Sequence, residues 1–210
     1  MTEIIARISE IGIVPVIVLD DPCLARPLAD ALAEGGLPCA EVTFRTPRAA
    51  HVLTVMARDP HLVAGAGTVL TVAQVDAAVD AGATYIVTPG YSHEVVVACQ
   101  DRGIPVIPGV ATPTEIQMAL ADGITLVKFF PAEASGGTRA LSAIAGPFPM
   151  LRFIPTGGIS PDNLDSYLAL PSVAAVGGSW MVTPGLVSGR KWTDISRLAA
   201  EAVAAVARHR

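Results

Sequence analysis

Charged, aromatic and cysteine residues are all scarce in this chain of 210 residues. Charged residues make up 16% of the chain against 51% hydrophobic residues, a balance that excludes a disordered tail and a coiled coil. The three cysteines, Cys23, Cys39 and Cys99, are far apart and show no C-x-x-C spacing, so neither a disulfide framework nor a zinc ribbon is indicated. We therefore expect all three to be small buried hydrophobic side chains.

Aromatic residues account for 5% of the chain, and the formal net charge is −5 with a pI near 5.3. A protein that binds nucleic acid needs a basic surface for the phosphate backbone and aromatic side chains on which bases stack. The sequence offers neither, so no nucleic acid partner is expected. Its composition instead fits an enzyme or a binder of small metabolites.

A long apolar helix is also missing, although the mean hydropathy is +0.53. The longest uncharged stretch, residues 166–189, contains two prolines and four glycines, which predict strand, turns and loop rather than a membrane-spanning helix. The amino terminus, MTEIIARISEIG, has an amphipathic helical pattern and lacks the cationic start and apolar centre of a secretory signal. We expect a cytoplasmic protein that does not contact membranes.

Eight short apolar runs recur along the chain at spacings of 21 to 26 residues, the length of one strand plus one crossover helix. They begin at Ile13, Cys39, Leu62, Thr84, Pro105, Leu126, Arg152 and Val173. Segments of helical composition lie between successive runs, at residues 24–34, 48–58, 72–80, 94–102, 115–121 and 138–145.

This regular alternation predicts an α/β fold, a (β/α)₈ TIM barrel, over residues 1–210 as a single domain. An amphipathic helix precedes the first strand, and a closing helix over residues 194–208 follows the last. An open doubly wound sheet is the alternative. It is disfavoured because no G-x-G-x-x-G follows the first strand and no change of composition divides the chain into halves.

Polar residues on the second predicted strand are the first candidates for chemistry. Glu41, Thr43 and Arg45 share one face of that strand, whereas the intervening residues are apolar and suit the helix-covered outer face. The three side chains should therefore point into the barrel, where the active site lies at the carboxyl ends of the strands. The alternative is that Glu41 and Arg45 form a buried ion pair that stabilises the barrel.

The sixth predicted strand contains one of only two lysines in the chain. Lys191 lies in a polar stretch typical of a surface, but Lys128 stands between Val127 and Phe129 inside a strand. Burial penalises the ammonium form of a lysine and so favours a neutral amine, which can attack a ketone and form a Schiff base. The alternative is a lysine that extends to the barrel rim and pairs with a carboxylate there.

A Schiff base at Lys128 would give Glu41 a role, because the carbon next to the iminium becomes acidic and a carboxylate can carry its proton. Arg45 offers a planar guanidinium group suited to a substrate carboxylate. Thr68, at the end of the third strand after small residues, is a second candidate contact for that carboxylate.

Glycine pairs end the seventh and eighth strands, at Gly157-Gly158 and at Gly177-Gly178, and Ser179 follows the second pair. Backbone N–H groups at such turns favour anions, and barrels often bind phosphate after these two strands. The substrate is therefore expected to be phosphorylated, and Thr156 should lie at the same rim. The four histidines fall outside the strand ends and show no ligand spacing, so neither a metal site nor a cofactor is expected.

The chain resembles the bacterial 2-keto-3-deoxy-6-phosphogluconate (KDPG) aldolases, which also act on 4-hydroxy-2-oxoglutarate. The resemblance covers nearly the whole chain. It rests on VPVIV from Val14, EVTFRT from Glu41, GAGTVL from Gly65, TPG from Thr88, PVIPGV from Pro105, VKFFPAEASGG from Val127, IAGPF from Ile144, PTGGIS from Pro155 and VGGSW from Val176.

The resemblance implies a trimeric class I aldolase of the Entner–Doudoroff pathway that uses no metal and no cofactor. Lys128 would form the Schiff base and Glu41 would transfer protons. The implied binding residues are Arg45, Thr68 and Thr156 for the pyruvate carboxylate, Gly157, Gly158 and Ser179 for phosphate, and Pro89 and Phe130 for the pocket walls. An aldolase for the galactonate epimer, a phosphate-binding barrel isomerase or synthase, and a non-catalytic metabolite binder are the alternatives.

Overall fold

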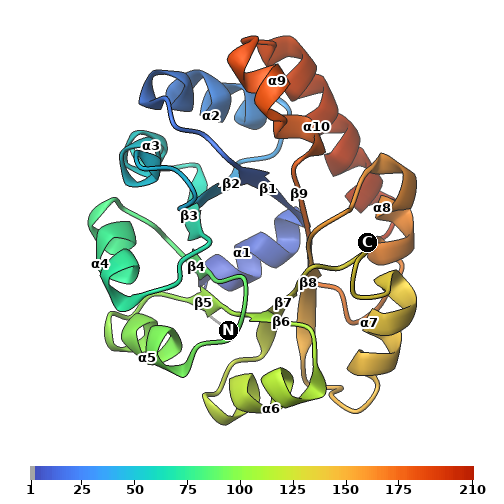
Figure 1. Cartoon of the computed structure of the whole chain (residues 1–210). Coiled ribbons are helices and arrows are strands. Elements are labelled where there is room, and N and C mark those ends of the chain that lie inside the picture. Colours follow the sequence, from blue (N-terminus) through green and yellow to red (C-terminus); the bar gives the residue numbers. More distant parts are fainter. Residues whose placement is uncertain (1–2) are drawn as a thin grey trace.

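The computed structural model describes residues 3–210, which form a ring of parallel strands surrounded by helices (Figure 1). The strands are β1 (Ile13–Ile17), β2 (Cys39–Thr43), β3 (Val63–Gly67), β4 (Ile86–Val87), β5 (Val106–Ile107), β6 (Gly109–Val110), β7 (Leu126–Phe129), β8 (Arg152–Pro155) and β9 (Val176–Gly178). They pair in the order β5-β4-β3-β2-β1-β9 and β6-β7-β8. Bridges from Phe153 to Val173 and from Thr156 to Gly177 join the two sets, so the eight predicted runs form the ring.

The fifth predicted run appears as two strands, β5 and β6, with Pro108 between them. Proline has no N–H to donate to a strand pair, so the ladder is interrupted at this residue. Its carbonyl still accepts a hydrogen bond from the Lys128 N–H at 2.9 Å. The chain therefore continues through the position of the fifth barrel strand beside β7.

The helices are α1 (Glu3–Ile11), α2 (Ala25–Glu34), α3 (Ala49–Met56), α4 (Val72–Asp80), α5 (His93–Asp101), α6 (Pro113–Ala121), α7 (Gly137–Ala145), α8 (Pro161–Leu168), α9 (Pro184–Ser188) and α10 (Trp192–Ala207). The predicted helical segments did not include α8 or α9, whereas the other helices match predicted segments. Short 3₁₀ helices cover Pro22–Leu24 (η1) and Trp180–Val182 (η2). The prediction of strand, turns and loop for residues 166–189 missed the short helix α9. Pro184 starts α9, and the Thr183 side chain caps this helix by accepting from the Leu186 N–H.

Apolar side chains fill the amino-terminal end of the barrel. One buried cluster contains Val14, Cys39, Val63 and Tyr85, together with Ile8 of α1. Figure 1 shows α1 behind the strands, across the opening of the ring. This packed base leaves the carboxyl ends of the strands as the end through which a small molecule can reach the interior.

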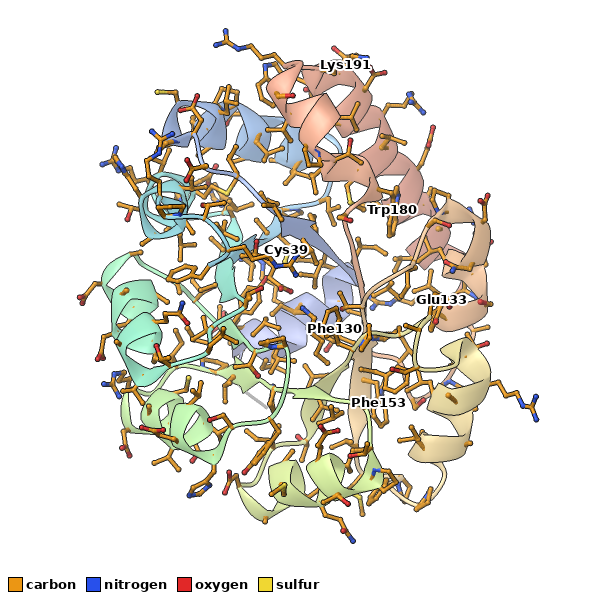
Figure 2. The ribbon with its side chains drawn as sticks, viewed as in Figure 1. Cys39, Phe130, Glu133, Phe153, Trp180 and Lys191 are labelled. Atoms are coloured by element: carbon orange, nitrogen blue, oxygen red, sulfur yellow. The ribbon has the colours of Figure 1, made fainter. Side chains whose placement is uncertain are left out.

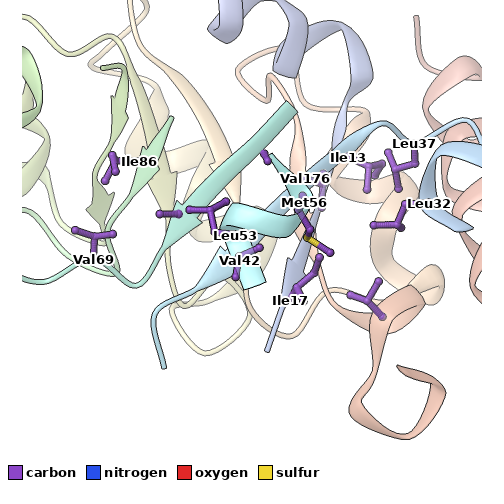
Figure 3. Close-up of a cluster of buried hydrophobic side chains, with 14 of the residues drawn as sticks. Ile13, Ile17, Leu32, Leu37, Val42, Leu53, Met56, Val69, Ile86 and Val176 are labelled. Carbon is purple, nitrogen blue, oxygen red and sulfur yellow. The ribbon is translucent and has the colours of Figure 1, made fainter. Parts of the chain in front are cut away.

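A second and larger cluster lies between the strands and the outer helices (Figure 3). Ile17 and Val42 face outward from β1 and β2, and Leu53 and Met56 of α3 belong to the same cluster. Cys99 is buried in it as predicted, whereas Cys23 is exposed in η1, so the prediction of three buried cysteines was wrong for Cys23. No helix within residues 3–210 has both the length and the hydrophobicity to cross a membrane.

Candidate active site

The alternation of side chains along β2 and β7 directs two charged groups into the barrel. Ala40 and Val42 belong to the outer cluster, so Glu41 between them faces inward, and it is 3% exposed. Val127 and Phe129 likewise face outward, so Lys128 faces inward and is 4% exposed. Period-two alternation therefore places a carboxylate and an amine in the same dry interior.

The two groups contact each other directly. Lys128 Nζ donates a hydrogen bond to Glu41 Oε1 at 2.9 Å, and it also lies 5.4 Å from the centre of the Phe130 ring. A buried charge needs such a partner, because an unpaired one is costly to remove from water. At this distance a proton can pass between the amine and the carboxylate without an intermediary.

The observed partners of Glu41, Lys128 and Arg45 decide between the alternatives raised by the sequence. The alternative of an ion pair between Glu41 and Arg45 does not hold, because Glu41 pairs with Lys128 and Arg45 is an exposed residue that donates to Thr68. The alternative for Lys128, a lysine at the barrel rim paired with a carboxylate, is right about the carboxylate partner. It is wrong about the position, because Lys128 is buried. The long range of the pair, 87 residues along the chain, explains why spacing alone did not indicate it.

Tyr85 and Cys39 are buried close to Glu41, at the amino-terminal end of the barrel interior. Their place beside Glu41 was not predicted from the sequence. Tyr85 is fully buried, and its Oη donates to the Ala40 carbonyl at 3.0 Å. Its ring occupies the space that a side chain at Gly65 would fill. Burial raises the pKa of the Cys39 thiol to about 12, so Cys39 remains protonated beside the carboxylate. The signal for these contacts was Gly65 on β3 together with Tyr85 just before β4.

Gly67 on β3 makes room for the Glu41 carboxylate. A Cβ at this position would lie 2.2 Å from Glu41 Oε1 and 2.7 Å from Glu41 Cδ, closer than any real contact. The absence of a side chain therefore fixes where the carboxylate can lie.

Gly67→Ala should displace the carboxylate of Glu41 from Lys128. We expect kcat to fall about 10- to 100-fold, because a misplacement of about 1 Å can cost that much in a positioned site. Gly185→Ala is the matched control, since a Cβ there meets nothing within 4 Å. Equal activity of the two variants would contradict this role of Gly67.

Thr68 follows β3 in a strained backbone conformation. Its φ is +57°, a left-handed value that is unusual for a β-branched residue. Its Oγ1 accepts a hydrogen bond from Arg45 Nε at 3.2 Å. Strain at a residue that orients a guanidinium group is typical of functional sites.

Thr68→Asn should raise stability and lower activity together, because asparagine tolerates the left-handed region and loses the placed hydroxyl. We expect the free energy of unfolding to rise by about 1 kcal/mol and Tm by about 2–4 °C. Thermal melts and kcat/KM measured on one preparation would check both. A loss of stability would contradict the assignment of strain to Thr68.

A cavity of about 260 Å³ opens at the carboxyl ends of the strands. Five of the predicted site residues line it: Arg45, Phe130, Thr156, Gly157 and Ser179. Val16, Val18, Ile159, Gly177, Gly178, Val182 and Pro184 complete the lining. Figure 2 shows Phe130 near the centre of the ring and Lys191, the other lysine, at the periphery of the molecule.

The other predicted residues lie around this cavity rather than on its wall. Glu41 and Lys128 are buried, and Lys128 contacts Phe130 of the cavity wall. Thr68 accepts a hydrogen bond from Arg45, which lines the cavity. Pro89 does not line the cavity. Its carbonyl instead packs where a side chain at Gly109 would be, between β4 and β6.

Glycines at the ends of β8 and β9 let the backbone approach the cavity. Gly157 and Gly158 have φ values of +101° and +79°, which only glycine adopts readily. A Cβ at Gly177 would lie 2.2 Å from Thr156 Oγ1. The turns therefore bring peptide groups, rather than side chains, to the wall, as anion sites require.

A larger hollow of about 680 Å³ lies at the opposite, amino-terminal end of the strands, next to Arg152 and Arg210. Both guanidinium groups donate to backbone carbonyls there, Arg152 to Val173 and Arg210 to Ala174. Polar groups at this end of a barrel contribute to stability rather than to chemistry. We therefore assign the active site to the smaller cavity. Within residues 3–210, no group of three or more histidine, cysteine or acidic side chains is arranged to hold a metal ion.

Comparisons with known proteins identify the family of the chain. The sequence model of a family described as "Aldolase: KDPG and KHG aldolase" matches residues 4–198. A 2-dehydro-3-deoxy-phosphogluconate aldolase of Haemophilus influenzae is 46% identical over 96% of this chain and 95% of that protein. A KHG/KDPG aldolase of Escherichia coli is 44% identical over 91% of this chain and 90% of that protein.

A solved structure shares the whole architecture. The KDPG aldolase of Legionella pneumophila, with pyruvate captured as a covalent carbinolamine intermediate, is 42% identical with a TM-score of 0.92, over 96% of this chain and 98% of that one. This likeness confirms the predicted barrel fold. Together with the match over residues 4–198, it establishes that the chain belongs to the family of KDPG and KHG aldolases.

Proposed function

We propose that the chain is a class I aldolase that cleaves 2-dehydro-3-deoxy-6-phosphogluconate into pyruvate and D-glyceraldehyde 3-phosphate. It also cleaves 4-hydroxy-2-oxoglutarate into pyruvate and glyoxylate. The observation that carries this proposal is the buried contact of 2.9 Å between Lys128 Nζ and Glu41 Oε1. The identities of 46% and 44% to aldolases named for the gluconate-derived substrate favour it over the galactonate epimer.

Lys128 is the nucleophile. Its ammonium group gives up one proton, to water or to Glu41, and the neutral amine attacks the C2 ketone of the substrate. The resulting carbinolamine takes that proton back on its hydroxyl group, loses water and becomes an iminium ion, so Glu41 is again a carboxylate. The iminium then accepts the electron pair of the C3–C4 bond when that bond breaks.

Glu41, next to Lys128, transfers protons to and from the bound substrate. As a carboxylate it removes the proton of the C4 hydroxyl group, which allows the C3–C4 bond to break and the aldehyde to leave. The resulting enamine takes a proton at C3 from Glu41, and water then hydrolyses the pyruvate iminium and frees Lys128. Neither a metal ion nor an organic cofactor has a step in this sequence.

Binding follows the two charged ends of the substrate. The guanidinium group of Arg45 and the hydroxyl groups of Thr68 and Thr156 hold the carboxylate at C1. Backbone groups of Gly157 and Gly158 and the hydroxyl of Ser179 hold the phosphate at the other end. Phe130 lines the cavity wall next to Lys128, and Pro89, which follows β4, packs against Gly109 outside that wall.

A coupled assay tests the proposed function. Lactate dehydrogenase and NADH report pyruvate released from each of the two proposed substrates and from the galactonate epimer. We expect release from both proposed substrates, with the higher kcat/KM for the phosphorylated one. Absence of pyruvate from both, at saturating concentrations, would contradict the proposal.

We further propose that three copies assemble in the cytoplasm, as the family resemblance implies. Sedimentation velocity should then give one species of three times the chain mass of 21.6 kDa. A concentration-independent monomer would contradict the trimer without affecting the proposed chemistry.

A further inference from the structure

Glu133 lies against the glycine turn that follows β8, although it comes from the segment after β7. Its backbone N–H donates to the Gly157 carbonyl at 3.1 Å. Its Cβ and Cγ occupy the space beside Gly158, where an added Cβ would lie 2.7 Å from Glu133 Cβ. Figure 2 places Glu133 outside the ring, toward α7 and α8. Both the backbone and the side chain of Glu133 therefore support this turn from its outer side.

The Glu133 carboxylate is held by Tyr167 of α8. Tyr167 is fully buried, and its Oη donates a hydrogen bond to Glu133 Oε1. Burial and the adjacent carboxylate hold the pKa of Tyr167 well above its usual range, so the hydroxyl remains a donor. A rigid, buried side chain thus fixes an otherwise exposed glutamate.

Contacts from the segment after β7 and from α8 orient three successive peptide groups of the turn. Ala132 N–H donates to the Thr156 carbonyl at 2.8 Å, Glu133 N–H to the Gly157 carbonyl, and Asn163 Nδ2 to the Gly158 carbonyl at 3.2 Å. In a trans peptide the N–H points opposite to the carbonyl. The N–H groups that follow these carbonyls, those of residues 157, 158 and 159, are therefore directed away from the donors that hold the carbonyls.

We propose that Glu133 and Tyr167 are positioning residues that hold the turn at Gly157-Gly158 in its phosphate-binding conformation, so that they set the preference for a phosphorylated ketoacid. The inference rests on the proposed function, because it assigns the phosphate subsite to this turn. Neither side chain lines the cavity, so both act through the backbone. A substrate without phosphate should not depend on them.

Tyr167→Phe tests the inference by removing one hydroxyl group. We expect KM for the phosphorylated substrate to rise about tenfold, because a hydrogen bond to a charged group is lost and the turn loosens. The kcat for that substrate and kcat/KM for 4-hydroxy-2-oxoglutarate should stay within about twofold of the parent values. Tyr91→Phe is the matched control: it also removes a tyrosine-to-carboxylate hydrogen bond, to Asp122, away from the turn.

Glu133→Ala and Glu133→Gln provide a second test that does not depend on Tyr167→Phe folding. Glutamine keeps an oxygen that accepts from Tyr167, so it should retain the low KM, whereas alanine should raise KM as Tyr167→Phe does. Equal losses for both substrates in Tyr167→Phe and Glu133→Ala would show a general structural role and overturn the inference. Unchanged kinetics would overturn it as well.

A readout without turnover separates this inference from the proposed function. Titration of the parent protein with inorganic phosphate should shift the backbone amide NMR signals of Gly157 and Gly158, and Tyr167→Phe should weaken that binding about tenfold. Shifts of equal affinity in both proteins would overturn the positioning role alone. No shift in the parent protein would remove the phosphate subsite, and with it the inference.

Discussion

Lys128→Met is expected to reduce kcat for ketoacid cleavage by about 10⁴- to 10⁶-fold, because the variant has no amine with which to form an iminium. Methionine has a similar length and suits a buried position, so the cavity wall beside Phe130 should persist. Pyruvate release in the coupled assay gives the size of the loss. Lys191→Met is the matched control, and it should keep full activity because Lys191 is exposed at the periphery.

Loss of activity in Lys128→Met must be separated from loss of folding. Removing one partner of a buried pair costs about 3–5 kcal/mol of unfolding free energy, whereas replacing both partners is often neutral. The double variant Lys128→Met/Glu41→Gln should therefore regain most of the stability that Lys128→Met loses and remain inactive. If the double variant regained activity with stability, the pair would be structural and the chemistry would lie elsewhere.

Glu41→Gln should slow proton transfer while leaving the amine able to react. We expect exchange of the pyruvate methyl protons with solvent deuterium to fall about 10²- to 10⁴-fold, the usual contribution of a general base. Glutamine keeps an oxygen near Lys128, so pyruvate should still form the covalent adduct. Proton NMR of pyruvate in deuterium oxide measures the exchange, and intact-protein mass spectrometry after reduction measures the adduct.

Glu94→Gln is the control for this variant, since Glu94 is an exposed glutamate at the start of α5. It should exchange pyruvate protons at the parent rate. Exchange at the parent rate in Glu41→Gln would remove Glu41 from proton transfer. Loss of the adduct in that variant would instead show that Glu41 is needed to deprotonate Lys128.

The barrel was predictable because its period is local. Each unit of strand and helix carries its own apolar run, and several helices are followed by a left-handed glycine, as at Gly36, Gly82, Gly103 and Gly123. Helix starts are also local, such as the capping box of Thr112 and Glu115 that opens α6. The split of the fifth strand at Pro108 and the short helix α9 were harder to predict. Both depend on a proline whose effect is set by its surroundings. Pro108 interrupts a strand, because it has no N–H to donate, whereas Pro184 begins a helix, where no N–H is needed.

The inward direction of Glu41 and Lys128 was also predictable, because alternation within one strand decides it. The pairing of Glu41 with Lys128 was not predictable from either strand alone. It depends on closure of the ring, which brings β2 and β7 to face each other across the barrel interior. The same limit applies to Gly67, whose role depends on a carboxylate from the neighbouring strand, and to Thr68, whose left-handed φ has no sequence signature. Tyr167 and Glu133 likewise meet only after α8 has packed against the ring.

Reduction with borohydride in the presence of pyruvate tests the central claim most directly. The account predicts one reduced pyruvate adduct per chain, located by peptide mapping at Lys128, with Lys191 unmodified and no adduct in Lys128→Met. An unmodified Lys128, or equal labelling of both lysines, would contradict the claim that the buried amine on β7 forms the Schiff base.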